Sequence, residues 1–122
     1  MKVKTSELAG VALDWAVPKC EGKEIFIDKE SPEFMCLGEM NLYRFSPTRY
    51  WAQGGPIIET EGINLGTQRN ESGFRPHLER MWHAQKDGRV HVGYGPTPLI
   101  TAMRCYVSAK LGDEVDVPEG LV

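Results

Sequence analysis

The sequence predicts an α+β fold in which an N-terminal and a C-terminal helix pack on a small, mainly antiparallel sheet. Amphipathic helical patterns lie near both ends of the 122-residue chain. An Asp-Gly pair at residues 87–88 separates two strand-like runs, which is a strong local signal for a β-hairpin. Short apolar runs of strand length lie between the helices, and this order of elements is typical of helices packed on an antiparallel sheet.

The first helix is expected to begin at Thr5 or Ser6, whose hydroxyl would accept a hydrogen bond from a free N–H group of the first turn. Pro18 cannot donate to the helical ladder and clashes with the preceding turn, so the helix is expected to end or kink by about Val17, with Gly22 closing the segment. The apolar side chains that recur with helical spacing are Leu8, Val11, Ala12, Trp15 and Ala16.

Strands are expected at residues 25–27 and 42–45 on either side of residues 28–41, an acidic stretch with proline and glycine that predicts a loop. Ser46 and Pro47 predict a helix start, with a hydroxyl cap and a proline at the first helical position.

That helix is expected to stop at Gln53, because the Gly54-Gly55 pair would break it. Pro56 would then open a second short helix that ends at Gly62. The polar residues 64–76 that follow predict a loop.

The hairpin is expected between residues 79–85 and 89–94, with two possible turns. A two-residue turn pairs Ala84 with His91 and puts His83 on the opposite face, whereas a three-residue loop places His83 opposite His91.

The most strongly signalled element is the last helix, which starts at Thr97-Pro98 and ends just before Gly112. Its apolar face consists of Leu99, Ala102, Met103, Tyr106, Val107 and Leu111. Residues 113–122 form an acidic C-terminal tail, and residues 1–122 are expected to make one domain.

Composition places the chain among ordinary globular proteins, with 41% hydrophobic and 25% charged residues. No apolar run is long enough to cross a bilayer, and the N-terminal residues do not resemble a signal peptide, so we expect no membrane contact and no export. The cysteines, at positions 20, 36 and 105, are odd in number and widely spaced, which predicts free thiols in a reducing cytoplasm.

Patterns for catalysis and metal binding are weak. No Cys-x2-Cys or His-x3-His spacing joins the cysteines and histidines, so no metal site and no cofactor are expected. Cys105 lies within an apolar helical pattern, where a thiol is unreactive, and the Gly54-Gly55-Pro56 segment lacks the lysine of a phosphate-binding loop. We therefore assign no catalytic residue and do not expect an enzyme.

Two groups of residues are candidates for binding a macromolecule. The first is an aromatic segment beside a glycine pair, which predicts a partner-binding patch at Tyr50, Trp51, Gln53, Gly54 and Gly55. The second combines bases with an aromatic ring for contact with nucleic acid, namely Arg80, Trp82, Arg89 and Arg104. Residues 64–110 carry seven bases and three acids although the whole chain has a net charge of −3, a segregation that also fits a merely solvated surface.

Three blocks of sequence resemble the NinX-type proteins of lambdoid phages. They comprise MKVKTSEL, ALDWAV and KCEG at residues 1–8, 12–17 and 19–22, FSP and WAQGGPII at 45–47 and 51–58, and GPTPLI, AMRCYV and KLG at 95–100, 102–107 and 110–112. The resemblance implies a phage or prophage protein in the cytoplasm of a bacterial host, from a family of unknown function that supplies no catalytic residues.

The sequence and the resemblance together favour a non-catalytic accessory protein that binds a host or phage macromolecule. The alternative is a nucleic-acid-binding factor in phage recombination or regulation. Homo-oligomerisation is left open.

Overall fold

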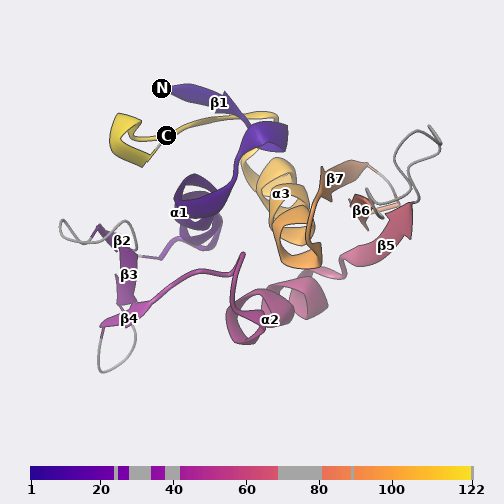
Figure 1. Ribbon diagram of the computed structural model, residues 1–122, viewed down its shortest axis with the longest axis horizontal. Coiled ribbons are helices and arrows are strands. Elements are labelled where there is room, and N and C mark those ends of the chain that lie inside the picture. Colours follow the sequence, from indigo (N-terminus) through magenta and orange to yellow (C-terminus); the bar gives the residue numbers. More distant parts are fainter. Residues whose placement is uncertain (24, 28–33, 38–41, 69–80, 89, 122) are drawn as a thin grey trace.

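The computed structural model describes residues 1–23, 25–27, 34–37, 42–68, 81–88 and 90–121 (Figure 1). These residues contain the helices α1 (Gly10–Glu21), α2 (Trp51–Glu61) and α3 (Pro98–Leu111). They also form three antiparallel sheets, which confirms the predicted α+β class but distributes the strands over several sheets in place of one. None of the described helices has the length and apolar character needed to cross a membrane.

The strands pair in the following orders. The chain ends form a ribbon of β1 (Lys2–Lys4) and β8 (Glu114–Asp116). The second sheet has the order β2 (Ile25–Ile27), β3 (Phe34–Leu37), β4 (Leu42–Arg44). The third has the order β5 (Asn64–Gln68), β6 (Met81–Lys86), β7 (His91–Gly95).

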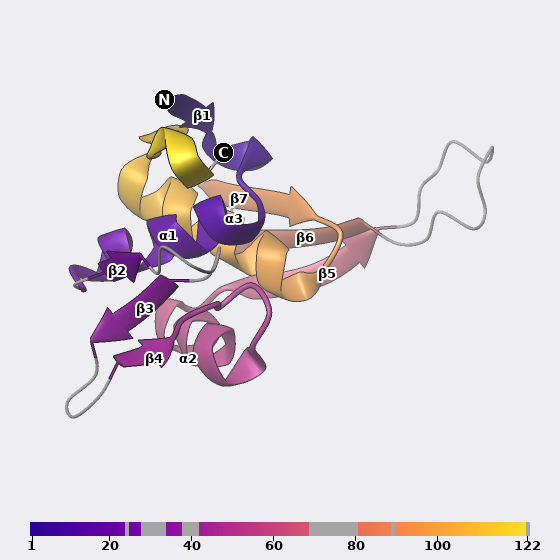
Figure 2. The ribbon, with the colours of Figure 1, turned by 60° about the vertical axis from the view of Figure 1, so that its left-hand side comes forward.

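Helix α3 lies at the centre of the molecule, between α1 and the β5–β6–β7 sheet (Figures 1 and 2). As predicted, Thr97 caps it by accepting a hydrogen bond from the Ile100 N–H at 3.2 Å, and Pro98 occupies its first turn. Gly93 of β7 lets helix and strand approach closely, because a Cβ there would lie only 2.6 Å from the Thr101 carbonyl oxygen. The C-terminal helix is thus the element that covers the sheet.

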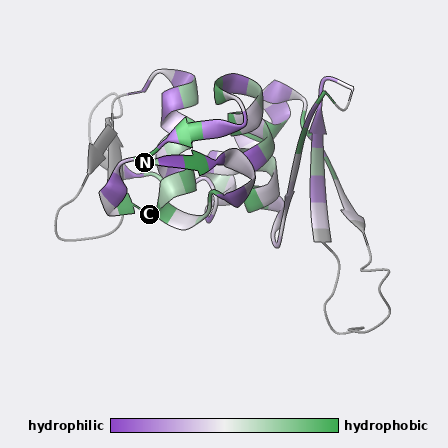
Figure 3. Ribbon diagram, turned by 90° about the horizontal axis from the view of Figure 1, so that it is seen from above, coloured by the Kyte–Doolittle hydropathy of each residue, from purple (hydrophilic) through white to green (hydrophobic). Residues whose placement is uncertain are grey.

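The hydrophobic core joins α1 to α3. Leu13 and Val17 from α1 and Met103 and Val107 from α3 are fully buried, and apolar positions concentrate on these central helices (Figure 3). Of the predicted apolar face of α3, only Leu111 is exposed, at 38%, because it lies at the last residue of the helix.

The two ends of the chain lie side by side (Figures 1 and 3). The amino group of Met1 contacts Asp116 Oδ1 at 2.8 Å and the Val117 carbonyl oxygen at 3.0 Å. Residues 113–121 of the acidic segment therefore belong to the folded structure, through β8 and a short 3₁₀ turn at Glu119–Leu121.

The N-terminal helix begins later than predicted and does not end at Val17, although Gly22 closes the segment as expected. Residues Thr5–Glu7 form a 3₁₀ turn, and the Thr5 hydroxyl donates to the Gly112 carbonyl oxygen at 2.6 Å instead of capping a helix. Pro18 lies inside α1, which continues to Glu21 and ends at Gly22 with φ +69°. Burial of Pro18 in the interior offsets the single helical hydrogen bond that the proline removes.

Two predicted loops contain strands. The structure places β3 within residues 28–41 and β5 within residues 64–76. Residues 28–33, 38–41 and 69–76 of these two stretches lie outside the described residues. Neither segment has a strong periodic pattern of its own. Each is a strand because it pairs with a neighbour, as β5 does along its whole length with β6.

The predicted break at Gly54-Gly55 is also wrong, since α2 is one continuous helix through both glycines and Pro56. It begins at Trp51, whereas residues 47–49 form a turn. As predicted, the element ends at Gly62, whose φ of +63° closes the helix.

The hairpin forms as predicted but with a longer connection. Lys86 pairs with His91, so residues 87–90 lie between the strands, and both Asp87 and Gly88 have positive φ values, of +54° and +65°. His83 pairs with Tyr94, three register positions from the Lys86–His91 pair, which places His83 and His91 on opposite faces of the sheet.

Candidate partner-binding surface at the start of helix α2

A buried carboxylate anchors the turn that precedes α2. Asp14 of α1 accepts hydrogen bonds from the Ser46 hydroxyl at 2.5 Å and from the Thr48 N–H at 3.0 Å. Burial raises the pKa of Asp14, and the hydrogen bonds from Ser46 and Thr48 partly oppose this shift. Ser46 is therefore not the helix cap that the sequence predicts, because its hydroxyl is committed to α1.

Gln53 fastens the same turn from within α2. Its side-chain oxygen accepts from the Ser46 N–H at 2.6 Å, and its amide nitrogen donates to the Arg44 carbonyl oxygen at 2.6 Å. The oxygen and the nitrogen of the Gln53 side-chain amide thus hold strand β4 and the following turn against the first turn of the helix.

The two glycines lie in different surroundings. A Cβ on Gly54 would lie 2.5 Å from the Pro47 carbonyl oxygen and 2.6 Å from Leu99 Cδ2, so Gly54 lets α2 approach both the turn and α3. A Cβ on Gly55 would have no atom within 4 Å. The glycine pair therefore serves packing at one position and leaves open space at the next.

Tyr50 and Trp51 stand on this anchored base and face solvent. Tyr50 is 40% exposed and Trp51 is 56% exposed. The Arg49 guanidinium lies 5.6 Å from the centre of the Tyr50 ring, and its Nε donates to the Ser46 hydroxyl oxygen at 2.9 Å. Two adjacent aromatic side chains are thus displayed from a turn whose backbone is fixed from several directions.

The predicted nucleic-acid group is placed differently. Arg104 points inward: its Nε donates to the Leu8 carbonyl oxygen and its NH1 to the Tyr94 carbonyl oxygen, both at 2.7 Å. Burial lowers the pKa of Arg104. Trp82 is half-buried on β6, and Arg80 and Arg89 lie outside the described residues. Arg104 therefore ties α3 to β7 and to the segment before α1.

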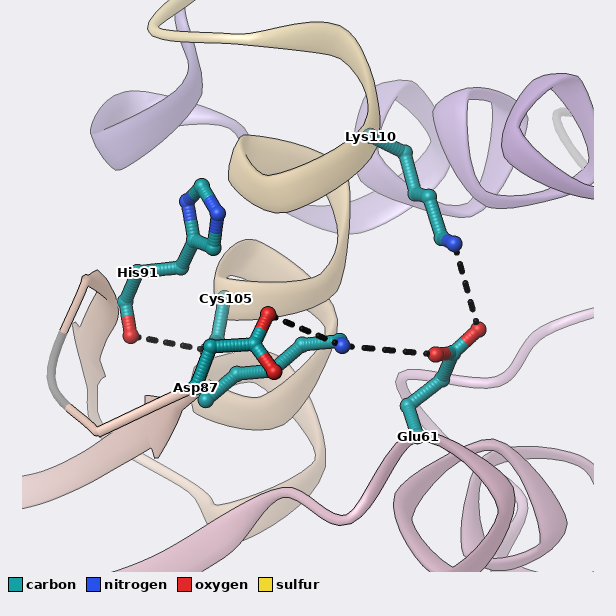
Figure 4. A network of polar contacts seen from close by, with 6 residues as sticks. Glu61, Asp87, His91, Cys105 and Lys110 are labelled. Carbon is teal, nitrogen blue, oxygen red and sulfur yellow. Dashed lines mark hydrogen bonds and ion pairs between the residues drawn. The ribbon is translucent and has the colours of Figure 1, made fainter.

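The described thiols are unsuited to nucleophilic chemistry. Burial raises the pKa of Cys20 to about 12 and that of Cys105 to about 11, so both are protonated near neutral pH. The Cys105 thiol donates to the His91 carbonyl oxygen at 3.6 Å (Figure 4). Within the described part of the chain, no three side chains of His, Cys, Asp or Glu converge as metal ligands would.

A charged cluster links α2, the hairpin and the end of α3 (Figure 4). Glu61 lies 3.6 Å from Lys86 and 3.7 Å from Lys110, and Lys86 also contacts Asp87 at 3.3 Å. The hydrogen bond that Lys86 donates to the Asp87 carboxylate raises the pKa of Lys86. These contacts join surface elements and leave the aromatic pair untouched.

The sequence alone could not reveal the Asp14 anchor, because nothing local marks two residues 32 positions apart as partners.

Comparison with protein families matches residues 4–110 to the family described as bacteriophage P22, NinX. Comparison with curated proteins gave no match.

Proposed function

Because the chain belongs to the NinX family of bacteriophage P22, we propose that it is a phage accessory protein that binds a macromolecule of the phage or its host through Tyr50 and Trp51. The observation that carries this proposal is the exposure of both rings on a turn held by Asp14 and Gln53. We infer that it acts in the cytoplasm of the infected cell.

The aromatic pair has the properties of an interface anchor. Trp and Tyr are enriched among the residues that dominate binding energy, since each buries a large area with few rotatable bonds. A fixed base lowers the ordering cost of binding further, because the turn does not have to be immobilised by the partner. The exposed neighbours Ala52 and Pro56 extend the low-polarity surface along the first turns of α2.

Nucleic acid is not our second candidate, because no observation favours it. Arg104 is the base of that predicted group that the structure describes, and its guanidinium donates hydrogen bonds to two backbone carbonyl oxygens. A phosphate would have to displace those hydrogen bonds.

Photo-cross-linking from the position of Trp51 in phage-infected cells tests the proposal. A cross-linking amino acid at Trp51 is expected to capture a partner that the same group at Val90, which is 73% exposed at the hairpin connection, does not capture. The captured partner is then purified and its affinity measured with Trp51→Ala and with Val90→Ala.

We expect Trp51→Ala to weaken binding by roughly 30-fold or more, as for an interface hot spot, and Val90→Ala to leave it unchanged. The unfolding free energy of Trp51→Ala should match that of the wild type, since the ring is mostly in solvent. A partner that binds all three proteins equally would contradict the proposal.

A further inference from the structure

A pocket of about 500 Å³ opens between the end of α1, one side of α2 and α3, and it shares Ala52 and Pro56 with the low-polarity surface around the aromatic pair. Its walls include the side chains of Glu21, Phe45, Glu61 and Tyr106. Its volume lies within the range of small-molecule sites in proteins. Trp51 and Tyr50 do not line it.

Tyr106 gives the pocket an unused polar atom. The residue is only 3% exposed, yet its hydroxyl makes no hydrogen bond to any other residue that the structure describes. Among those residues, no side-chain oxygen is both fully buried and without a partner, so the hydroxyl keeps some accessible surface, and the Tyr106 side chain lines this pocket. A buried tyrosine normally pairs its hydroxyl, which makes this oxygen available to a ligand.

Two carboxylates, those of Glu21 and Glu61, line the same pocket. The side chains of Glu21 and Glu61 are 18% and 20% exposed. The distances from Glu61 to Lys86 and Lys110, 3.6 and 3.7 Å, exceed the roughly 2.8 Å of a direct charge-assisted hydrogen bond. The Glu61 oxygens are therefore only partly engaged and can accept from a further donor.

A side chain of the protein itself shows which kind of group the Glu21 and Phe45 wall of the pocket can bind. The Lys23 ammonium lies 2.6 Å from Glu21 Oε2 and 5.1 Å from the centre of the Phe45 ring. A carboxylate and an aromatic face together bind an alkylammonium group, through an ion pair and a cation–π contact. The Lys23 side chain is 40% exposed, so a competing cation can reach this position.

We propose that this pocket binds a small organic cation, whose alkylammonium group contacts Glu21, Glu61 and the Phe45 ring and donates a hydrogen bond to the Tyr106 hydroxyl oxygen. Tyr50 and Trp51 do not line this pocket, so binding of the cation does not require the aromatic pair. The Lys23 ammonium competes for the same wall.

The test is an NMR titration of the full chain with 1,4-diaminobutane, following the ring resonances of Phe45 and Tyr106. The neutral isostere 1,4-butanediol is the charge control, and Nα-acetyl-lysine amide represents a lysine side chain. We expect saturable shifts with an amine and none with the diol, and the tighter of the two amines identifies a free amine or a protein side chain as the source. Absence of saturable shifts with both amines, or equal shifts with the diol, would overturn the proposal.

Matched variants separate the pocket from general charge effects. Lys23→Met is expected to strengthen amine binding roughly threefold by removing the competing ammonium. Lys19→Met makes the same change in net charge, but its ammonium lies over Trp15 at 5.3 Å, outside the pocket, and should leave the affinity unchanged. Equal effects of the two variants would refute the competition and with it the site.

Glu61→Gln should weaken binding roughly tenfold, the effect of one hydrogen bond to a charged group, whereas exposed Glu59→Gln on the same helix should not. Tyr106→Phe removes only the hydroxyl and should weaken binding roughly fivefold, which keeps the test valid if Glu61→Gln does not fold. Wild-type affinity in Tyr106→Phe, or equal losses in the two glutamate variants, would count against the pocket.

Discussion

Alanine at the two adjacent glycines of α2 should change stability in opposite directions. Both positions are helical, so each Gly→Ala change gains about 0.5–1 kcal/mol from the lower entropy of the unfolded chain. At Gly55 nothing opposes the gain, because the new methyl group has no atom within 4 Å. We therefore expect Gly55→Ala to stabilise the protein by about 0.5–1 kcal/mol.

At Gly54 the same methyl group meets two close atoms. It would lie 2.5 Å from the Pro47 carbonyl oxygen and 2.6 Å from Leu99 Cδ2, whereas ordinary contacts begin near 3.4 Å. The Leu99 methyl can move, but the Pro47 carbonyl belongs to the backbone of the anchored turn. Overpacking of this kind costs about 1–3 kcal/mol, and it also strains the base of the aromatic surface.

Urea denaturation followed by circular dichroism measures both variants, with unchanged slopes confirming that the two-state comparison is valid. Because both variants share the entropic gain, their free energies of unfolding should differ by the overpacking cost, about 1–3 kcal/mol, with Gly54→Ala the less stable. If the two variants shift stability equally, or if Gly54→Ala stabilises the protein, the close approach of α2 to Pro47 is not a feature of the folded state.

Three further predictions concern ionisable groups. Burial raises the pKa of Asp14, so the folded protein favours the protonated carboxyl. The stability of the wild type relative to Asp14→Asn should therefore be highest below the ordinary pKa of aspartate and fall as the pH rises through the raised pKa. Urea titrations in which this stability difference rises with pH would contradict the prediction. Alkylation at pH 8, followed by mass spectrometry of each peptide, should modify Cys20 and Cys105 far more slowly in the native than in the unfolded protein, and equal rates would show that the thiols are accessible and ionised. The Met1 ammonium lowers the pKa of Asp116. The contact between the chain ends should therefore persist above the ordinary pKa of the carboxyl and be lost as the pH falls through the lowered pKa. An NMR titration of Asp116 with an ordinary midpoint would refute this prediction.

Part of the candidate surface could be predicted from local sequence. An aromatic pair next to a glycine-rich segment indicated a surface feature, and the structure shows Tyr50 and Trp51 exposed. Their role in binding stays a prediction. Gln53 could not be assigned from sequence, because its carboxamide is committed to backbone atoms at Arg44 and Ser46 that only the fold brings within reach.

The contacts of Arg104 could not be predicted from the sequence either. Its position in a basic, aromatic stretch suggested a phosphate contact, but a long side chain on α3 reaches whichever carbonyl groups the neighbouring elements present. The fold presents the Leu8 and Tyr94 carbonyl oxygens, 96 and 10 residues away. Sequence spacing carries no information about such a choice.

The sequence alone determined the elements whose signals lie within one segment. Thr97 and Pro98 start α3, a regular apolar period fills it and Gly112 follows its end, so this helix is specified by its own residues. The Asp87-Gly88 pair fixes the hairpin in the same way, since both residues adopt positive φ.

The tertiary structure decided everything that depends on contact between distant segments. Helix α2 continues through glycines and a proline because its packing against α3 and the Pro47 turn outweighs a weak local preference. The β5 segment is a strand because β6 offers it a complete hydrogen-bonding partner, and the aromatic surface is fixed because Asp14 reaches it from another helix. Local sequence reports the free energy of one segment in water, whereas these features depend on free energy gained only when two segments meet.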